Sequence, residues 1–297
     1  MMTKHDNSSQ NLLTQRLEDF GGSGDELWLA HANGYPPGSY RAFIEELTPH
    51  FSVTGYKHRP MWDEFNADER LSWMLFADDM IETLQQKGGD APWVVGHSMG
   101  ATIAMLAAAK HPELFRGLVL LDPVFKRSRH VLALRFMSEA QKRRMPMVRK
   151  TLKRPSLFAN RQAAYAFHRE RRAFGRFSDE ILWDYINAGT KETGDGRVEL
   201  AFSPQWEAAV YTSVPWVWPS IRRIEVPMMV LRGQESPVFT RSMYNRVLLL
   251  QPDAVLGQAP GGHLLPMEHP DTTAERVLAF LRLEGASVRD SEQSMSA

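Results

Sequence analysis

The sequence predicts an α/β fold in which a mostly parallel sheet, flanked by helices, is interrupted by an inserted helical cap. Two observations carry this prediction. Short apolar runs typical of buried strands alternate with amphipathic helical patterns along both ends of the chain. The stretch between these ends is helical in pattern and strongly basic. We therefore expect the first part of the core at residues 1–123, the cap at 124–223 and the second part of the core at 224–297.

The predicted elements follow one another in a regular order. We expect strands at 26–31, 51–56, 93–95, 118–121, 227–232 and 254–256. We expect amphipathic helices at 37–50, 67–86, 101–109, 240–250 and 271–283. Helices between successive strands imply right-handed crossovers and a parallel sheet. In such a sheet the functional residues collect at the carboxyl ends of the strands.

The amino-acid composition limits the class of protein to which this chain can belong. A chain of 297 residues with 43% hydrophobic residues can bury a substantial core. The absence of cysteine excludes disulfides and thiolate metal sites. The first twenty residues lack the apolar run of a secretory signal, and no stretch approaches the ~18 apolar residues that span a bilayer. We expect a cytoplasmic protein without stable membrane insertion, and the sequence gives no indication of its oligomeric state.

The chain changes from strand to helix within two residues at Ser98. Glycine stands two residues before and two residues after this serine, in the run Gly96-His97-Ser98-Met99-Gly100. Such a corner forces Ser98 into a left-handed backbone conformation, and the glycines relieve the crowding around it. The serine hydroxyl then lies over the positive end of a helix. The alternative is a structural turn that happens to hold a serine.

This junction is the Gly-x-Ser-x-Gly nucleophile elbow of α/β-hydrolases. Residues 25–123 and 224–284 together resemble that superfamily, and specifically its serine hydrolases with a helical cap. The resemblance implies the α/β-hydrolase fold and an acyl-enzyme formed on Ser98. Epoxide hydrolases and haloalkane dehalogenases of the same fold use aspartate at this position, so we do not expect their chemistry.

A serine hydroxyl needs a base within hydrogen-bonding distance to act as a nucleophile. His263 lies in the run Gly261-Gly262-His263, after the last predicted strand and before the last helix. The resemblance places the base in this loop. A solvent-exposed loop histidine is the alternative for His263, and we expect His97 and His269 to be structural.

The acid that orients His263 is open between two residues. The resemblance most often places an aspartate a few residues after the glycine that follows the next-to-last strand. Here those positions hold Ser236 and Pro237, and Glu235 stands one residue away. Asp122, at the end of the strand after the elbow, is the preferred candidate and Glu235 the alternative. A dyad without an acid, with Asp122 capping a turn, is the third possibility.

The oxyanion of an acyl-transfer intermediate needs backbone N–H donors fixed in advance. We expect one donor from Met99, directly after the nucleophile. The resemblance implies a second donor from Tyr35, because the run Asn33-Gly34-Tyr35 follows the first long strand, where the family carries a His-Gly-type motif. Tyr35 could equally form an apolar lip of the pocket.

The first half of the cap is basic. Residues 124–176 contain sixteen Lys and Arg against two Glu, a net charge of +14 that the rest of the neutral chain balances. A solvated helical face is one interpretation. A field that attracts an anionic substrate and adsorption to anionic lipid are the two others. No nucleic-acid recognition fold is visible, so we do not expect a nucleic-acid partner.

The predicted function is that of a serine hydrolase that cleaves a carboxylic ester or related acyl bond. The expected substrate is a small molecule with an apolar acyl group, because aromatic residues are numerous in the cap. Thioesterase, lactonase and carbon–carbon bond hydrolase activities are alternatives, as is a non-hydrolytic ligand-binding protein on the same fold. No residue spacing indicates a metal site or a cofactor, so we expect neither.

Overall fold

The molecule is built around one seven-stranded sheet. The structure, a computed structural model, describes residues 11–69 and 71–295, with side chains as far as residue 284. The strands lie in the order β1-β3-β2-β4-β5-β9-β10, and all neighbours are parallel except β1 and β3. Their bounds are β1 Leu17–Asp19, β2 Glu26–Ala30, β3 Ser52–Tyr56, β4 Trp93–His97, β5 Gly117–Leu121, β9 Met228–Gly233 and β10 Val255–Ala259. The predicted fold class is confirmed.

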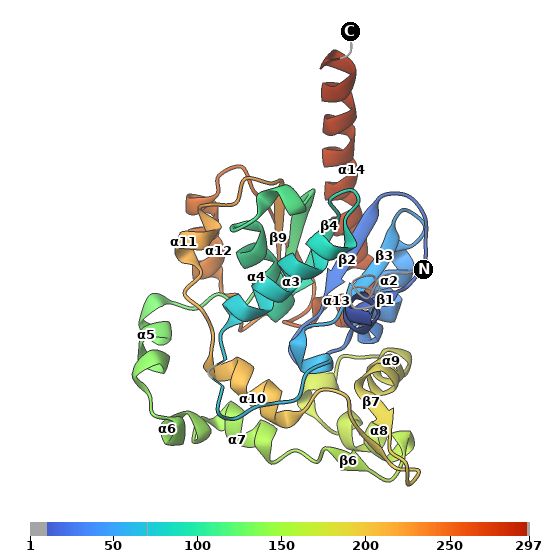
Figure 1. The fold of residues 1–297 in the computed structure, drawn as a ribbon, viewed down its shortest axis with the longest axis vertical. Helices are drawn as coiled ribbons and strands as arrows, with labels where there is room; N and C mark the ends of the chain where they lie inside the picture. The colour runs from blue at the N-terminus through green and yellow to red at the C-terminus, as the bar shows by residue number, and fades with distance from the viewer. Residues whose placement is uncertain (1–10, 70, 296–297) are drawn as a thin grey trace, which may run out of the picture.

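Both faces of the sheet are covered by helices, which explains why the central strands are apolar throughout. Along β4, Val94 packs into one hydrophobic core, whereas Trp93 and Val95 pack into the other. The first core is closed by α3 (Trp73–Lys87), α4 (Met99–Ala108) and α12 (Arg241–Leu250). The second is closed by α2 (Arg41–Leu47) and α14 (Pro270–Met295). Figure 1 shows α14 extending beyond the sheet.

The segment between β5 and β9, residues 124–223, is called the cap segment below. It gathers on one side of the core in Figure 1. Its helices are α5 Ser128–Phe136, α6 Glu139–Arg143, α7 Pro146–Leu152, α8 Arg161–Arg169, α9 Asp179–Gly189, α10 Pro204–Thr212 and α11 Trp218–Ile221. Three short antiparallel strands form a second sheet, in the order β6 (Leu157–Phe158), β8 (Val198–Leu200), β7 (Thr190–Glu192). Two partners for β8 satisfy the backbone groups that a lone strand would leave unpaired.

Several element bounds differ from the predictions. The helix expected at 37–50 is split into the 3-10 turn η1 (Pro37–Tyr40) and α2. The last helix was expected to end near residue 283 but runs to Met295, because no proline interrupts it. Three further 3-10 turns are η2 Arg59–Met61, η3 Pro112–Leu114 and η4 Arg172–Phe174. Among the described residues, no helix has both the length and the apolar character needed to cross a membrane.

Candidate active site

The junction between β4 and α4 has the geometry of a strained elbow. Ser98 has φ +56° and ψ −113°, a backbone conformation that non-glycine residues rarely adopt. A Cβ added to Gly96 would lie 2.5 Å from the Cα of Ala101. A Cβ added to Gly100 would overlap the carbonyl oxygen of Ala30, at the end of β2. Only glycine fits at both positions, so the sequence motif is a direct requirement of the turn.

Three side chains that are distant in sequence meet at the carboxyl edge of the sheet. Ser98 Oγ lies 2.8 Å from His263 Nε2, and His263 Nδ1 lies 2.7 Å from Asp122 Oδ2. A carboxylate only accepts hydrogen bonds, so Nδ1 carries the ring hydrogen and Nε2 is free to accept from the serine hydroxyl. Ser98 and Asp122 are buried, and the His263 side chain is 23% exposed. A substrate can therefore reach the imidazole while the acid stays shielded from water.

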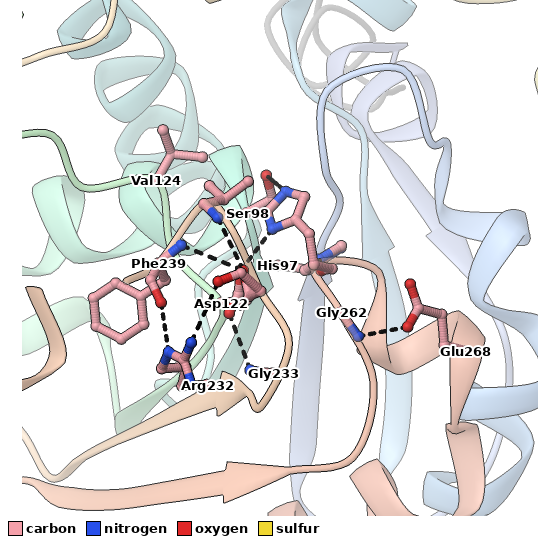
Figure 2. A network of polar contacts seen from close by, with 12 residues as sticks. His97, Ser98, Asp122, Val124, Arg232, Gly233, Phe239, Gly262 and Glu268 are labelled. Carbon is pink, nitrogen blue, oxygen red and sulfur yellow. Dashed lines mark hydrogen bonds and ion pairs between the residues drawn. The ribbon is translucent and has the colours of Figure 1, made fainter. Parts of the chain in front are cut away.

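The Asp122 carboxylate accepts hydrogen bonds from two groups at and just after the end of β9, besides the one from His263. The N–H of Gly233 donates to Oδ1 at 3.0 Å (Figure 2). The hydroxyl of Ser236 donates to Oδ2 at 2.5 Å, beside the bond from His263. Asp122 itself has φ +43°, a left-handed conformation that orients the carboxylate toward this edge. Ser236 thus stands at a position where the resemblance places an acid. It instead donates a hydrogen bond to Asp122, which directly follows β5.

Glu235 lies away from the imidazole. Its carboxylate pairs with the guanidinium of Arg176 in the cap segment, and its side chain is 61% exposed. The same guanidinium lies 3.3 Å from Glu268, which accepts the N–H of Gly262 beside the base (Figure 2). Glu235 therefore belongs to a surface ion-pair cluster that connects the cap segment to the loop of His263, and it makes no contact with His263.

The chain after β2 forms a tight turn next to the elbow. The N–H of Tyr35 donates to the carbonyl oxygen of Ala32 at 3.1 Å, and Gly34 has φ +81°. This pattern is typical of a type II β-turn, which requires a positive φ at its third residue. The structure differs here from the expectation for Tyr35, because its N–H already closes the turn and is not free for an oxyanion. In this described loop, the N–H groups of Asn33 and Gly34 have no hydrogen-bond partner.

At the elbow itself, Met99 is the first residue of α4. Its N–H therefore belongs to the group of amides at a helix N-terminus that no carbonyl of the same helix can satisfy. That Met99 offers a backbone donor beside Ser98 stays a prediction.

A chain of hydrogen bonds that the sequence did not indicate runs behind the base. The N–H of Ala32 donates to the Tyr40 hydroxyl at 2.9 Å, and that hydroxyl lies 2.7 Å from His97 Nδ1. His97 Nε2 lies 2.7 Å from the carbonyl oxygen of His263. A carbonyl only accepts, so Nε2 carries the hydrogen of His97, and Tyr40 donates to Nδ1. This chain connects the turn after β2 to the backbone of the base.

The imidazole of His97 is neutral over the ordinary pH range. Complete burial, with the nearby His263, lowers the pKa of His97 to about 3. Its tautomer is therefore fixed by its two partners. The expectation that His97 is structural agrees with this position, and its signal in the sequence is only its place inside the elbow motif.

The cap segment reaches the turn after β2 through a buried carboxylate. Glu207 on α10 is 5% exposed and lies against Gly34, whose added Cβ would be 3.1 Å from Glu207 Oε2. Asn33 Nδ2 donates to the backbone carbonyl of Glu207 at 3.2 Å. The guanidinium of Arg154 pairs with the Glu207 carboxylate at 2.5 Å, and the Tyr211 hydroxyl donates to it at 3.1 Å. The turn is thus fixed from the core side by Tyr40 and from the cap side by Glu207.

The described side chains contain no group of three or more His, Cys, Asp or Glu residues arranged to hold a metal ion. The contacts among Ser98, His263 and Asp122 can deprotonate a hydroxyl and stabilise the resulting imidazolium.

Comparison with known proteins places the chain in a family. Residues 28–276 match the alpha/beta hydrolase family. A pimeloyl-[acyl-carrier protein] methyl ester esterase from Yersinia enterocolitica is 33% identical over 102 residues, which span 34% of this chain and 38% of the esterase. A 2-(acetamidomethylene)succinate hydrolase from Mesorhizobium japonicum is 22% identical over 210 residues, 69% of each chain.

A solved structure shows the same fold. The crystal structure of E-2-(acetamidomethylene)succinate hydrolase superimposes with a TM-score of 0.72 at 19% identity, over 90% of this chain and 94% of that one. The family match covers most of the sheet and the whole cap segment. This chain therefore belongs to the alpha/beta hydrolase family.

Proposed function

We propose that the protein is a serine hydrolase that cleaves a carboxylic ester, or a related acyl bond, through an acyl-enzyme on Ser98. The observation that carries this proposal is the continuous line of hydrogen bonds from Ser98 through His263 to Asp122. The names of its relatives, which include an esterase and a succinate-derivative hydrolase, support acyl-bond hydrolysis in general.

Each residue of the site has a defined task in this reaction. Ser98 Oγ attacks the carbonyl carbon while His263 Nε2 takes the hydroxyl proton. Asp122 stabilises the imidazolium that forms and keeps its Nδ1–H in place. Nε2 then returns the proton to the leaving alkoxide, so the carbon–oxygen bond breaks and the acyl-enzyme remains. Water, deprotonated by the same Nε2, attacks the acyl-enzyme and releases the carboxylic acid with Ser98 restored.

The negative oxygen of each tetrahedral intermediate needs two fixed donors. We assign the first to the N–H of Met99, at the start of α4. We assign the second to Asn33 rather than to Tyr35, because the Tyr35 N–H is used within the turn. Asn33 is the second residue of that turn, and its side chain is held by a buried hydrogen bond to the carbonyl of Glu207.

A fluorophosphonate probe tests the nucleophile directly. We expect the wild-type protein to be labelled covalently and Ser98→Ala to remain unlabelled. Ser138→Ala, which changes an exposed serine at the start of α6, is the matched control and should be labelled as fast as wild type. Absence of labelling in the wild type would instead support a non-hydrolytic ligand-binding protein.

A panel of p-nitrophenyl esters with increasing acyl length tests the substrate class. We expect turnover to depend on Ser98 for every ester and to rise with acyl length until the chain no longer fits beneath the aromatic residues of the cap segment. Turnover of acyl thioesters or lactones at a higher kcat/KM than any ester would assign the protein to one of those classes, with the same nucleophile.

A further inference from the structure

Two neighbouring cavities are lined by residues of α5, α11 and α12 and of the segments next to them, and Ser98 does not line either one. These three helices lie on one side of the molecule in Figure 1. The first has a volume of about 380 Å³ and the second about 360 Å³. Trp218 and Arg246 line both of them. The two cavities therefore adjoin at these two residues and are together called the groove below; Ser98, Asp122 and His263 do not line it.

The groove is lined by arginines that form no ion pair with an acidic residue among the described residues. Its lining includes five arginines, namely Arg127, Arg129, Arg222, Arg223 and Arg246. No carboxylate lines either cavity, and none of the five forms an ion pair within the part of the chain that the structure describes. Elsewhere in the cap segment, arginines such as Arg161 and Arg169 do pair with acidic residues. Uncompensated guanidiniums around a concave surface are a typical arrangement for binding phosphate, because their planar donors match its oxygens.

Two tryptophans give the groove an aromatic wall. The indole N–H of Trp218 donates to the carbonyl of Lys126 at 2.9 Å, and Arg246 stacks 4.1 Å above the Trp218 ring. The indole N–H of Trp216 donates to Ser128 Oγ at 2.9 Å, yet 54% of Trp216 is exposed. Both rings are thus held in fixed orientations, and Trp216 has open surface on which a flat ring can stack.

We propose that this groove binds a nucleotide, with its base on Trp216 and its phosphates among the five arginines. An acidic protein segment would also meet positive charge here. The observations favour a small flat anion, because the charge surrounds two concave cavities and an indole ring fixed by a hydrogen bond. The nucleotide can be free or can be the nucleotide part of a larger acyl thioester, and both carry the same chemistry.

Isothermal calorimetry with ADP tests the groove. We expect saturable binding that weakens as salt is added. Adenosine lacks the phosphates and pyrophosphate lacks the ring, so each should bind at least tenfold more weakly than ADP. Equal affinity for ADP and pyrophosphate would overturn the proposal, since the groove would then bind anions without using its aromatic wall. Binding of an acidic peptide that ADP does not displace would overturn it as well.

Substitutions in the groove test whether ADP binds there. Arg246→Gln removes the arginine shared by both cavities and should weaken ADP binding about tenfold, whereas Trp216→Ala should weaken ADP but not pyrophosphate. Arg143→Gln, an exposed arginine of α6 outside the groove, is the matched control and should bind as wild type. An equal loss in Arg143→Gln would show that only the general charge of the cap segment matters.

The proposal is independent of the catalytic assignment. Ser98→Ala should bind ADP with wild-type affinity, so failure of the hydrolase proposal would leave this result unchanged. If ADP binds and inhibits ester turnover competitively, the nucleotide belongs to the substrate. If ADP binds without inhibition, the ligand is a free nucleotide at a separate site. Both results retain the groove as a nucleotide site.

Discussion

Polar side chains are buried and hydrogen-bonded in the core around Ser98, but are mostly exposed in the first half of the cap segment. In the core, the buried carboxylate of Asp122 accepts hydrogen bonds from three separate groups, and even His97 behind the base uses both ring nitrogens. In the first half of the cap segment, most of the cationic side chains are exposed. The difference indicates that the core fixes one arrangement of polar groups, whereas the cap segment leaves most of its charge exposed to solvent.

The largest effect should come from the acid in the core. Asp122→Asn preserves the shape but presents an amide to His263, which favours the wrong tautomer, so we expect kcat to fall about 10⁴-fold. Glu235→Gln is the matched control and should change kcat less than twofold, because Glu235 contacts only Arg176 and the surface. Steady-state kinetics on one ester measures both. A larger loss in Glu235→Gln would move the acid to the end of β9.

The next effect is expected where the two regions meet. Glu207→Gln removes the buried charge that pairs with Arg154 and leaves a partly buried guanidinium without its counterion. We expect the free energy of unfolding to fall by about 2–3 kcal/mol. Urea denaturation measures this loss. Glu199→Gln breaks an exposed ion pair with Lys191 and should cost less than ~1 kcal/mol. Similar losses in the two variants would show that burial of Glu207 contributes nothing.

Acid pH should weaken the core through histidines that are buried and neutral. Burial lowers the pKa of His31 to about 4 and that of His97 to about 3, below the ordinary value of 6.5. The unfolded chain therefore binds these protons first, so stability is complete above pH 6.5 and is lost as the pH falls toward 4. Each histidine contributes up to ~1.4 kcal/mol per pH unit in that range.

The cap segment contains a single comparable group, which permits a clean test. Burial lowers the pKa of His168 to about 4. His168→Gln should reduce the slope of unfolding free energy against pH by the share of one proton. Unfolding by urea at pH 7, 6 and 5 gives these slopes. An unchanged slope in His168→Gln would contradict the assignment.

The smallest effect concerns the link behind the base. Tyr40→Phe removes the hydroxyl that joins the N–H of Ala32 to His97. The two lost hydrogen bonds, each worth about 1 kcal/mol, should lower kcat by about tenfold or more with little change in KM, because the buried hydroxyl faces Ala32 and His97. Tyr244→Phe, on α12, is the control. An altered KM with normal kcat in Tyr40→Phe would place Tyr40 in the substrate pocket instead.

Sequence reasoning went furthest where local geometry dictates residue type. The strand-to-helix corner admits only glycine at positions 96 and 100, so the motif could be identified without any tertiary information. The choice between Asp122 and Glu235 could not be made that way. It depends on which strand end reaches His263 Nδ1, and on Ser236 being a donor in the place usual for the acid.

Other features were missed because they depend on neighbours in space. We expected the N–H of Tyr35 to be an oxyanion donor, but this N–H donates to the carbonyl of Ala32 within the turn. A sequence pattern does not show such a hydrogen bond. Strand β1 has only three residues and is paired antiparallel at the edge of the sheet, too short for a hydrophobic period. In the cap segment, the hydrophobic pattern indicated helices, but β6 and β7 became strands by pairing with β8.

The close approach of Gly100 to the carbonyl of Ala30 has a consequence for protein engineering. Because of this contact, α4 packs directly against the end of β2, and β2 leads into the turn of Asn33 and Gly34. The spacing between Ser98 and the turn of Asn33 and Gly34 is therefore set by contact of main chain with main chain, and no side chain can adjust it. Efforts to redirect this scaffold to new substrates should diversify the 124–223 insertion and leave the β2–α4 contact untouched.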